Sequence, residues 1–192
     1  MGLEKLGVDV NAAGHIEVDQ YMRSRVPTIY ACGDVAAVPY QLTHAAAHYA
    51  WYSAVNSLFS ELWHFKADHR VIPRVIFCQP EIVSVGLNEQ SAKKAGLVTE
   101  TTVFKLDELD RAIIDGKTTG FIKVLTPVAK DKILGVTIVG EQAGDMLTEF
   151  VLAMKHGLGL NKILATIHAY PTWGERINIP LGYGKRTTNQ SG

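Results

Sequence analysis

Residues 168–175, His-Ala-Tyr-Pro-Thr-Trp-Gly-Glu, hold the densest group of side chains able to hold or move a proton. Pro171 disfavours helical geometry at Tyr170, so we expect the phenol to project at the start of a helix. A titratable group followed by the carboxylate of Glu175 matches a base and its orienting partner. The alternative is structural: the threonine caps a helix, Glu175 stabilises its positive end, and His168 is a hydrogen-bonded polar residue.

The second candidate is Gly33-Asp34, which follows the apolar run 26–32. A carboxylate at the end of a strand accepts hydrogen bonds from sugar or ribityl hydroxyls, and the glycine lets a ligand approach the backbone. A helix expected to begin near Leu42-Thr43-His44 directs N–H groups and a positive dipole end to the same place, where a reduced flavin gains negative charge. The alternative is a tight turn with an exposed aspartate.

Three further patterns are weaker. His44 and His48 are four residues apart, a spacing that binds zinc on a helix, but no third ligand follows and we expect no metal site. Glycines at 157–159 and 182–184 lack the remainder of a phosphate-binding loop. Arg111 follows an acidic stretch and is expected in a solvated charged loop.

The first 65 residues predict short strands and one long helix to position these groups. Apolar alternation at 8–10 and 16–18 predicts two strands, and the run 26–32 predicts a buried one. Ala-rich residues 41–65 place apolar side chains on one face, which predicts a helix with Thr43 near its cap. The polar residues that follow mark a boundary.

The second segment predicts strands followed by helices. Strand patterns cover residues 75–77, 82–85, 98–106, 120–125 and 133–139. Helix patterns cover residues 88–95 and 149–155. Pro80 marks a kink or a sheet edge, Asn88 and Asn161 are expected helix caps, and Pro171 is expected to open a last helix. This order indicates an antiparallel α+β domain.

Composition excludes several classes of protein. The 192 residues are 47% hydrophobic and carry 19 basic and 19 acidic side chains, so no net charge favours nucleic acid or an anionic membrane. No apolar run approaches the roughly 20 residues that span a bilayer, and the first residues lack the apolar core of a signal peptide. Cys32 and Cys78 are too far apart for a CxxC-type redox pair. We therefore expect a cytoplasmic protein with reduced thiols.

Several motifs occur in an order and spacing that resemble one family. They lie at residues 14–19, 28–35, 42–46, 80–87 and 168–175. Together they resemble the C-terminal part of the class I pyridine nucleotide-disulfide oxidoreductases, which include dihydrolipoamide dehydrogenase, glutathione reductase and mercuric reductase. The resemblance covers nearly the whole chain, and residues 41–44 and 169–171 are most similar to the mercuric-reductase-like branch.

The resemblance implies three parts. Residues 1–68 would be the C-terminal remnant of an FAD-binding α/β domain, residues 69–185 an α+β dimerisation domain, and residues 186–192 a flexible tail. The dimerisation domain would hold an antiparallel sheet with helices, and the protein would be an obligate homodimer.

The resemblance also implies site residues. Gly33 and Asp34 would hold the ribityl chain of FAD, while Leu42, Thr43 and His44 would lie at the helix start that faces the isoalloxazine ring.

Across the dimer, Tyr170 and Glu175 of one subunit would line the site that holds the flavin and redox disulfide of the other. His168 matches the first histidine of the family's HxHPT pattern. Tyr170 is a departure, because the disulfide reductases have their catalytic histidine there. A free phenol ionises near pH 10, so a tyrosine is a poor base near neutrality but can donate a hydrogen bond or weakly contact a metal ion. This departure argues against efficient dihydrolipoamide or glutathione chemistry.

The family's Gly-rich FAD loop, CxxxxC disulfide and inserted NAD(P) domain do not occur in these 192 residues. We therefore expect a C-terminal fragment of an FAD- and NAD(P)H-dependent oxidoreductase whose N-terminal FAD and NAD(P) domains are missing. Such a fragment is expected to bind no cofactor and to be inactive by itself. The alternative is a stand-alone, non-catalytic dimerisation module.

Overall fold

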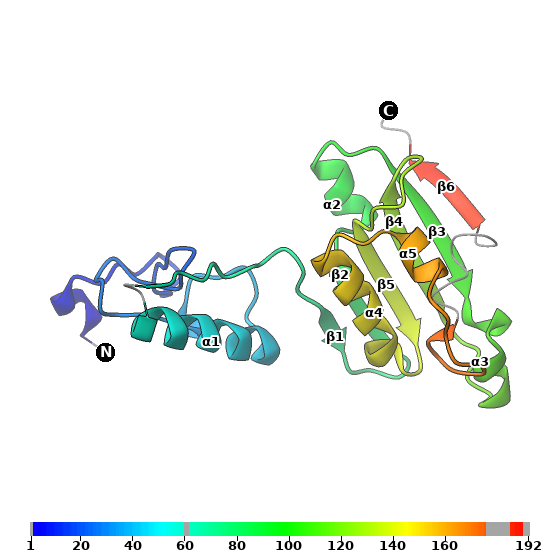
Figure 1. Cartoon of the computed structure of the whole chain (residues 1–192), viewed down its shortest axis with the longest axis horizontal. Coiled ribbons are helices and arrows are strands. Elements are labelled where there is room, and N and C mark those ends of the chain that lie inside the picture. The colour runs from blue at the N-terminus through cyan, green and yellow to red at the C-terminus, as the bar shows by residue number, and fades with distance from the viewer. Residues whose placement is uncertain (1, 60–61, 176–184, 190–192) are drawn as a thin grey trace. The chain divides into compact units, whose positions relative to one another are not determined.

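A computed structural model describes residues 2–59, 62–175 and 185–189 (Figure 1). The chain divides into two compact units, Met1–His69 and Arg70–Gly192, which are called unit 1 and unit 2. No helix among the described residues is both long and apolar enough to cross a membrane.

Unit 1 consists of one long helix and irregular loops. Its elements are the 3-10 turns η1 (Leu3–Leu6) and η2 (Gly33–Val35) and the helix α1 (Thr43–Phe59). The strands expected at 8–10, 16–18 and 26–32 are wrong, because the described residues there pair only through isolated bridges such as Val10 with Ile16. The side chains of Asn11 and Asp19 bond to backbone N–H groups two and four residues ahead, so the chain turns before a ladder can extend.

Helix α1 is shorter than its apolar pattern predicts. Thr43 is its first residue, and the helix ends at Phe59 rather than near residue 65. Its buried residues recur every three or four positions and so form one face: Ala45, Tyr49, Ser53 and Asn56.

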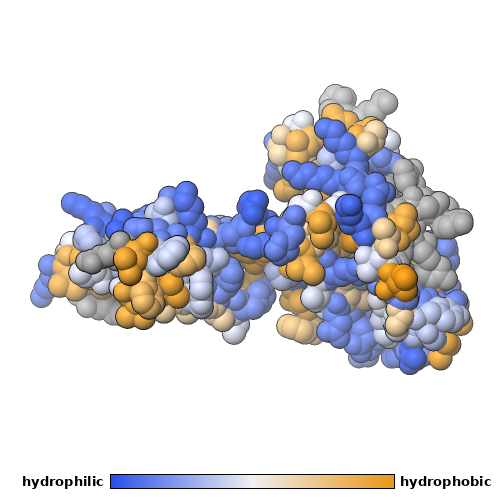
Figure 2. All heavy atoms as spheres, viewed as in Figure 1, coloured by the Kyte–Doolittle hydropathy of each residue, from blue (hydrophilic) through white to orange (hydrophobic). Residues whose placement is uncertain are grey.

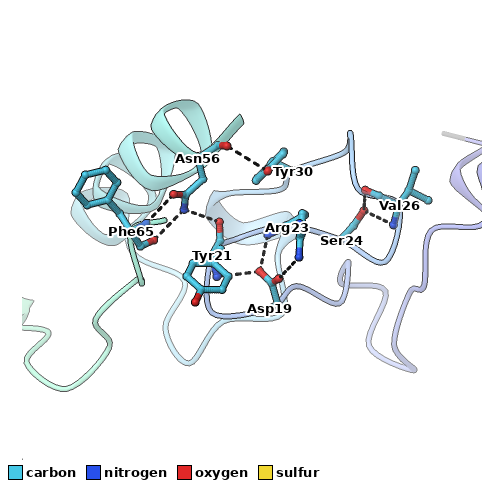
Figure 3. A network of polar contacts seen from close by, with 8 residues as sticks. All are labelled: Asp19, Tyr21, Arg23, Ser24, Val26, Tyr30, Asn56 and Phe65. Carbon is cyan, nitrogen blue, oxygen red and sulfur yellow. Dashed lines mark hydrogen bonds and ion pairs between the residues drawn. The ribbon is translucent and has the colours of Figure 1, made fainter. Parts of the chain in front are cut away.

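Asn56 explains why the chain leaves α1 and folds back. Its side-chain nitrogen donates to the carbonyls of Tyr21 (3.0 Å) and Phe65 (2.8 Å), and its Oδ1 accepts from the N–H of Phe65 at 2.9 Å (Figure 3). The phenol of Tyr30 donates to the Asn56 carbonyl at 3.2 Å. One buried amide therefore ties α1 to two separate loops.

Unit 2 is built on a six-stranded sheet. The strands are β1 (Arg74–Ile76), β2 (Glu81–Gly86), β3 (Thr99–Lys105), β4 (Phe121–Pro127), β5 (Gly135–Gly140) and β6 (Lys185–Asn189). Their order is β1-β2-β5-β4-β3-β6, and every neighbouring pair is antiparallel. The predicted antiparallel α+β fold is confirmed, and the strand that precedes Pro80 lies at the sheet edge as expected.

Strand β6 differs from the prediction of a flexible tail after residue 185. Residues 185–189 pair with β3, with Thr187 opposite Thr101 and Thr188 opposite Glu100. The Lys-Arg-Thr-Thr-Asn sequence has no apolar alternation, so its place is decided by the open edge of β3 rather than by local pattern.

Five short helical elements accompany the sheet. They are α2 (Glu89–Lys94), η3 (Leu106–Glu108), α3 (Asp110–Ile114), α4 (Ala143–Lys155) and α5 (Leu160–Leu164). Asn88 caps α2 as predicted, accepting from the N–H of Ser91 at 2.8 Å. Helix α4 begins six residues earlier than its pattern predicts, and Arg111 lies in α3 rather than in a loop.

The helices expected at Asn161 and Pro171 differ from their predictions among the described residues. The cap expected at Asn161 is wrong: Gly159 is the cap, because the next N–H, that of Leu160, is taken by the carbonyl of Asp131 at 2.8 Å. The helix expected from Pro171 is not seen up to Glu175, where the chain forms turns, and its continuation lies outside the described residues.

The core of unit 2 lies between the sheet and two helices. Helices α4 and α5 cover the same face of the sheet (Figure 1). The core side chains include Val83, Val85, Ile122, Val124 and Ile138 from the strands, Met146, Leu147 and Phe150 from α4, and Leu160 and Ile163 from α5. Burial of these apolar side chains stabilises unit 2, because each Å² of apolar surface removed from water contributes roughly 25 cal/mol.

Candidate functional site

The two candidate regions lie in different units, so each is described by itself. The Gly33-Asp34 region belongs to unit 1, together with Leu42, Thr43 and His44. The 168–175 region belongs to unit 2.

In unit 1, the turn η2 is packed against the first part of α1. Gly33 has a positive φ of 73°, and a Cβ built on it would lie 3.4 Å from the Cβ of Ala46, one helical turn after Leu42. The N–H of Ala36 returns to the carbonyl of Gly33 at 3.1 Å, and the side chain of Asp34 is exposed. The backbone conformation at residue 33 favours glycine, while the space beside Ala46 is in the range of ordinary van der Waals contact.

The start of α1 lies beside that turn. The N–H of Ala46 bonds the carbonyl of Leu42 at 2.8 Å, so the N–H groups just before it have no partner within the helix. Leu42 is half-buried, while Thr43 and His44 are exposed. The amide of Gln41 bonds the ring of His15 at 2.7 Å and approaches the carbonyl of Asp34 at 3.5 Å. The structure therefore brings all five predicted residues of unit 1 to one region.

In unit 2, His168 braces the second candidate region. Its Nε2 lies 2.8 and 3.0 Å from the two carboxylate oxygens of Glu149 on α4, and its Nδ1 lies 2.9 Å from the carbonyl of Thr166. The ring is only 13% exposed. Both ring nitrogens therefore face oxygen acceptors. His168 therefore fixes the chain just before Tyr170.

Tyr170 itself stands at the surface, 71% exposed. Its phenol donates to Oδ2 of Asp110, the first residue of α3, at 2.9 Å. A phenol has one proton to donate, and in this geometry Asp110 accepts it.

Glu175 closes the turn that follows the cis bond between Tyr170 and Pro171. One of its carboxylate oxygens accepts from the N–H of Thr172 at 3.1 Å, and the Thr172 hydroxyl donates to the carbonyl of Ala169 at 2.7 Å. These contacts shape the loop that carries the phenol.

Sequence reasoning missed two members of this region, Glu149 and Asp110. They lie 19 and 60 residues from their partners, so no local spacing reveals them. Helices α3 and α4 both contact the 166–175 segment, α3 through Asp110 at Tyr170 and α4 through Glu149 at His168.

Two groups with perturbed pKa values contact each other in unit 1, outside the candidate region. The phenol of Tyr49 and Nδ1 of His69 lie 2.9 Å apart. Burial raises the pKa of Tyr49, and the neighbouring Tyr40 adds to the rise. Burial lowers the pKa of His69, against the opposing charge of Asp68. No cluster of three or more His, Cys, Asp or Glu able to hold a metal occurs in the part of the chain that is described.

Comparisons with known proteins define the class to which this fold belongs. Residues 72–179 match the family model described as pyridine nucleotide-disulphide oxidoreductase, dimerisation domain, and residues 1–50 match that of pyridine nucleotide-disulphide oxidoreductase. The chain belongs to the pyridine nucleotide-disulphide oxidoreductase family.

Individual relatives agree with the family models. A dihydrolipoyl dehydrogenase of Geobacillus stearothermophilus is 38% identical over 176 residues, which cover 91% of this chain and 36% of the relative. A mercuric reductase of Bacillus cereus is 34% identical over 181 residues, which cover 94% of this chain and 28% of the relative. The chain thus spans about a third of the length of the curated relatives it matches.

Solved structures show the same fold. LpdA of Mycobacterium tuberculosis superposes with a TM-score of 0.83 at 22% identity, covering 92% of this chain and 38% of that one. The flavoprotein disulfide reductase RclA of Escherichia coli superposes with a TM-score of 0.78 at 22% identity, covering 90% of this chain and 39% of that one.

Proposed function

We propose that this chain supplies the dimer interface and part of the flavin and active site of an FAD-dependent NAD(P)H:disulfide, or related acceptor, oxidoreductase. The observation that carries the proposal is the pair of family matches, which together span a flavoenzyme segment and a dimerisation domain. Residues 1–68 would be the last part of the FAD-binding domain, and the dimerisation domain would begin at residue 69.

The geometry of unit 1 fits one end of FAD. Asp34 presents an exposed carboxylate that can accept hydrogen bonds from ribityl hydroxyls, beside a glycine whose missing side chain leaves the backbone accessible. The start of the 17-residue α1 adds a positive dipole end. When bound, FAD would carry reducing equivalents between the nicotinamide and the acceptor.

In the proposed active site, the chain's own residues hold the phenol in place. The contact of His168 with Glu149 fixes the segment before the turn, and Asp110 orients the Tyr170 hydroxyl. Glu175 stabilises the turn and thereby the position of Tyr170. This arrangement supports a Tyr170 that positions the electron-accepting substrate by hydrogen bonding. It does not supply an imidazole at residue 170 that could abstract a proton.

Exposed apolar side chains of unit 2 support a homodimer. Leu152 of α4 is 58% exposed, Leu164 of α5 is 50% exposed, and Ile167 is 98% exposed. Figure 2 shows apolar side chains exposed among polar ones on the face of unit 2 that it presents. Large exposed apolar side chains on neighbouring elements are typical of interfaces.

Sedimentation of the purified chain tests this interface. We expect a species of twice the 21.0 kDa chain mass, and we expect Leu152→Glu to shift it to the monomer. Val128→Glu, at an exposed position on the turn after β4, is the matched control and should leave the dimer intact. A wild-type monomer would contradict the proposed homodimer.

A second candidate is a stand-alone dimerisation module, favoured by the two isolated cysteines, Cys32 and Cys78, both free thiols. It predicts the same dimer but no flavin and no turnover from the complete reading frame. Free thiols also agree with the proposed cytoplasmic location, because reducing compartments keep them unpaired. Flavin bound by the protein encoded in the complete reading frame separates the two candidates.

A further inference from the structure

A cleft of about 230 Å³ lies in unit 2, and none of its lining residues belongs to the candidate sites described above. It is lined by Glu100 and Thr102 of β3, Thr126 of β4, Ala129, Lys130 and Asp131 in the segment after β4, and Leu160 and Asn161 of α5. All of these belong to unit 2, so the cleft is complete within one compact unit.

The two threonines face inward. Thr102 is two residues from the core residue Phe104 on β3, and Thr126 is two residues from the core residue Val124 on β4. Residues two apart on a strand share a face, so both threonine side chains lie on the sheet face that the helices cover. Thr102 stands opposite Val124 in the β3–β4 register, which makes Thr126 its diagonal neighbour. Diagonal neighbours on paired strands lie within side-chain reach of one another.

Both hydroxyls are buried without a partner. Thr102 and Thr126 are each only 4% exposed, and neither side chain has a hydrogen bond with any residue of the described structure. A valine would fill the same space and pack against the core without burying a polar atom. A buried, unpartnered hydroxyl is costly and calls for a solvent or ligand partner, and here both threonines line the cleft.

The other residues that line the cleft indicate which kind of ligand it can bind. The half-buried Asp131 contributes a carboxylate, whose Oδ2 is 3.4 Å from the N–H of Asn161. Asp131, the two hydroxyls and the half-buried Glu100, which lies directly opposite Thr126, are oxygen acceptors around one small space. A primary ammonium has three N–H donors and a charge that suits the carboxylates. Lys130, the cation of the lining, is exposed and stands at the rim.

We propose that this cleft binds a small primary ammonium compound, held by Thr102, Thr126 and Asp131. The volume admits a molecule of a few non-hydrogen atoms rather than a cofactor. The proposal is independent of the oxidoreductase assignment, because no residue of the candidate flavin or active site takes part.

An NMR titration of the purified chain with ethanolamine tests the proposal. We expect saturable shifts of the Thr102 and Thr126 methyl resonances. Tetramethylammonium, which has the charge but no N–H donor, and ethylene glycol, which has hydroxyls but no charge, should bind at least about tenfold more weakly. Shifts that do not saturate, or equal responses to the three probes, would overturn the proposal.

Isosteric variants locate the site and separate binding from folding. Thr102→Val, Thr126→Val and Asp131→Asn should each weaken ethanolamine binding at least about tenfold, whereas Lys130→Met should retain it. The two valine variants should unfold at the same or a higher denaturant concentration than the wild type, because each removes an unpartnered hydroxyl. Wild-type affinity in both valine variants, or cleft density explained by water alone in an ethanolamine-soaked crystal, would contradict the assignment.

Discussion

The phenol of Tyr170 donates a hydrogen bond to Oδ2 of Asp110 across 2.9 Å, and so joins the residue before Pro171 to the first residue of α3. The phenol proton is therefore directed at a carboxylate. Tyr170 is thereby held at an exposed position by a carboxylate of α3.

Removal of the Tyr170–Asp110 hydrogen bond should change how the substrate is positioned more than it changes the stability of the fold. Tyr170→Phe and Asp110→Asn should each alter the free energy of unfolding by less than about 1 kcal/mol, because exposed hydrogen bonds contribute little. Both should lower acceptor reduction in the protein encoded by the complete reading frame. Urea unfolding together with steady-state kinetics checks this, and unchanged kinetics in both variants would exclude the positioning role.

Tyr170→His tests whether the missing imidazole limits disulfide chemistry. In the protein encoded by the complete reading frame, an imidazole next to Asp110 would restore a group that titrates near neutrality. We expect a gain in disulfide reduction over the wild type. Tyr170→Gln is the matched control without a titratable ring, and equal rates for the two variants would show that another feature is limiting.

The His168–Glu149 contact should hold the loop that carries Tyr170. Glu149→Ala leaves the mostly buried ring without its carboxylate and should cost about 1–3 kcal/mol of unfolding free energy. Amide hydrogen exchange at Thr172 should accelerate in the same variant. Thr148→Ala, an exposed neighbour on α4, is the control. Unaltered exchange at Thr172 in Glu149→Ala would contradict the bracing role.

Asn56 should be among the most sensitive positions of unit 1. It is 1% exposed, and Asn56→Ala would leave the N–H and carbonyl of Phe65 and the carbonyl of Tyr21 without their partner. The expected loss is about 3 kcal/mol, from unsatisfied groups and a small cavity. Ser57→Ala, one residue further along the helix surface, should be nearly neutral. Equal unfolding midpoints for both variants in urea would refute this account.

Acid should destabilise unit 1 through His69. Its pKa is lowered in the folded state, so below pH about 6.5 the unfolded chain binds more protons. The contribution of His69 to the stability of unit 1 is fully present above pH about 6.5 and is lost as the pH falls below it. Tyr49, with a raised pKa, acts in the opposite range, and its contribution is lost as pH rises above about 10.

His69→Gln should therefore flatten the stability profile of unit 1 between pH 7 and pH 5. His64→Gln, which replaces an exposed imidazole, serves as the control. Fluorescence-detected unfolding at several pH values measures both variants. A profile for His69→Gln as steep as that of the wild type would assign the acid sensitivity to other groups.

The parts of the fold that the sequence predicts are those fixed by local chemistry. The Asn88 side chain caps the first turn of α2 without help from distant residues. Apolar residues at every second position of β4 and β5 pack into the core on one face of the sheet. Strand β6 has no such pattern, because its position depends on the edge of β3, more than 80 residues earlier in the chain.

The candidate site shows the same limit. Gly33, with its positive φ beside α1, could be singled out from its Gly-Asp context. Glu149 and Asp110 could not, because an acidic residue on a helix surface is common and only the folded chain brings them to His168 and Tyr170. Local rules therefore locate the loops, and tertiary structure decides which side chains meet in them.

The central claim is that this chain completes a flavin site, and flavin content measures it most directly. The protein encoded by the complete reading frame should purify with bound FAD and oxidise NAD(P)H. Asp34→Ala should lose most of the flavin, while Glu17→Ala, which removes an exposed carboxylate elsewhere in unit 1, should keep it. A wild-type protein with neither bound flavin nor NAD(P)H oxidation would contradict the account.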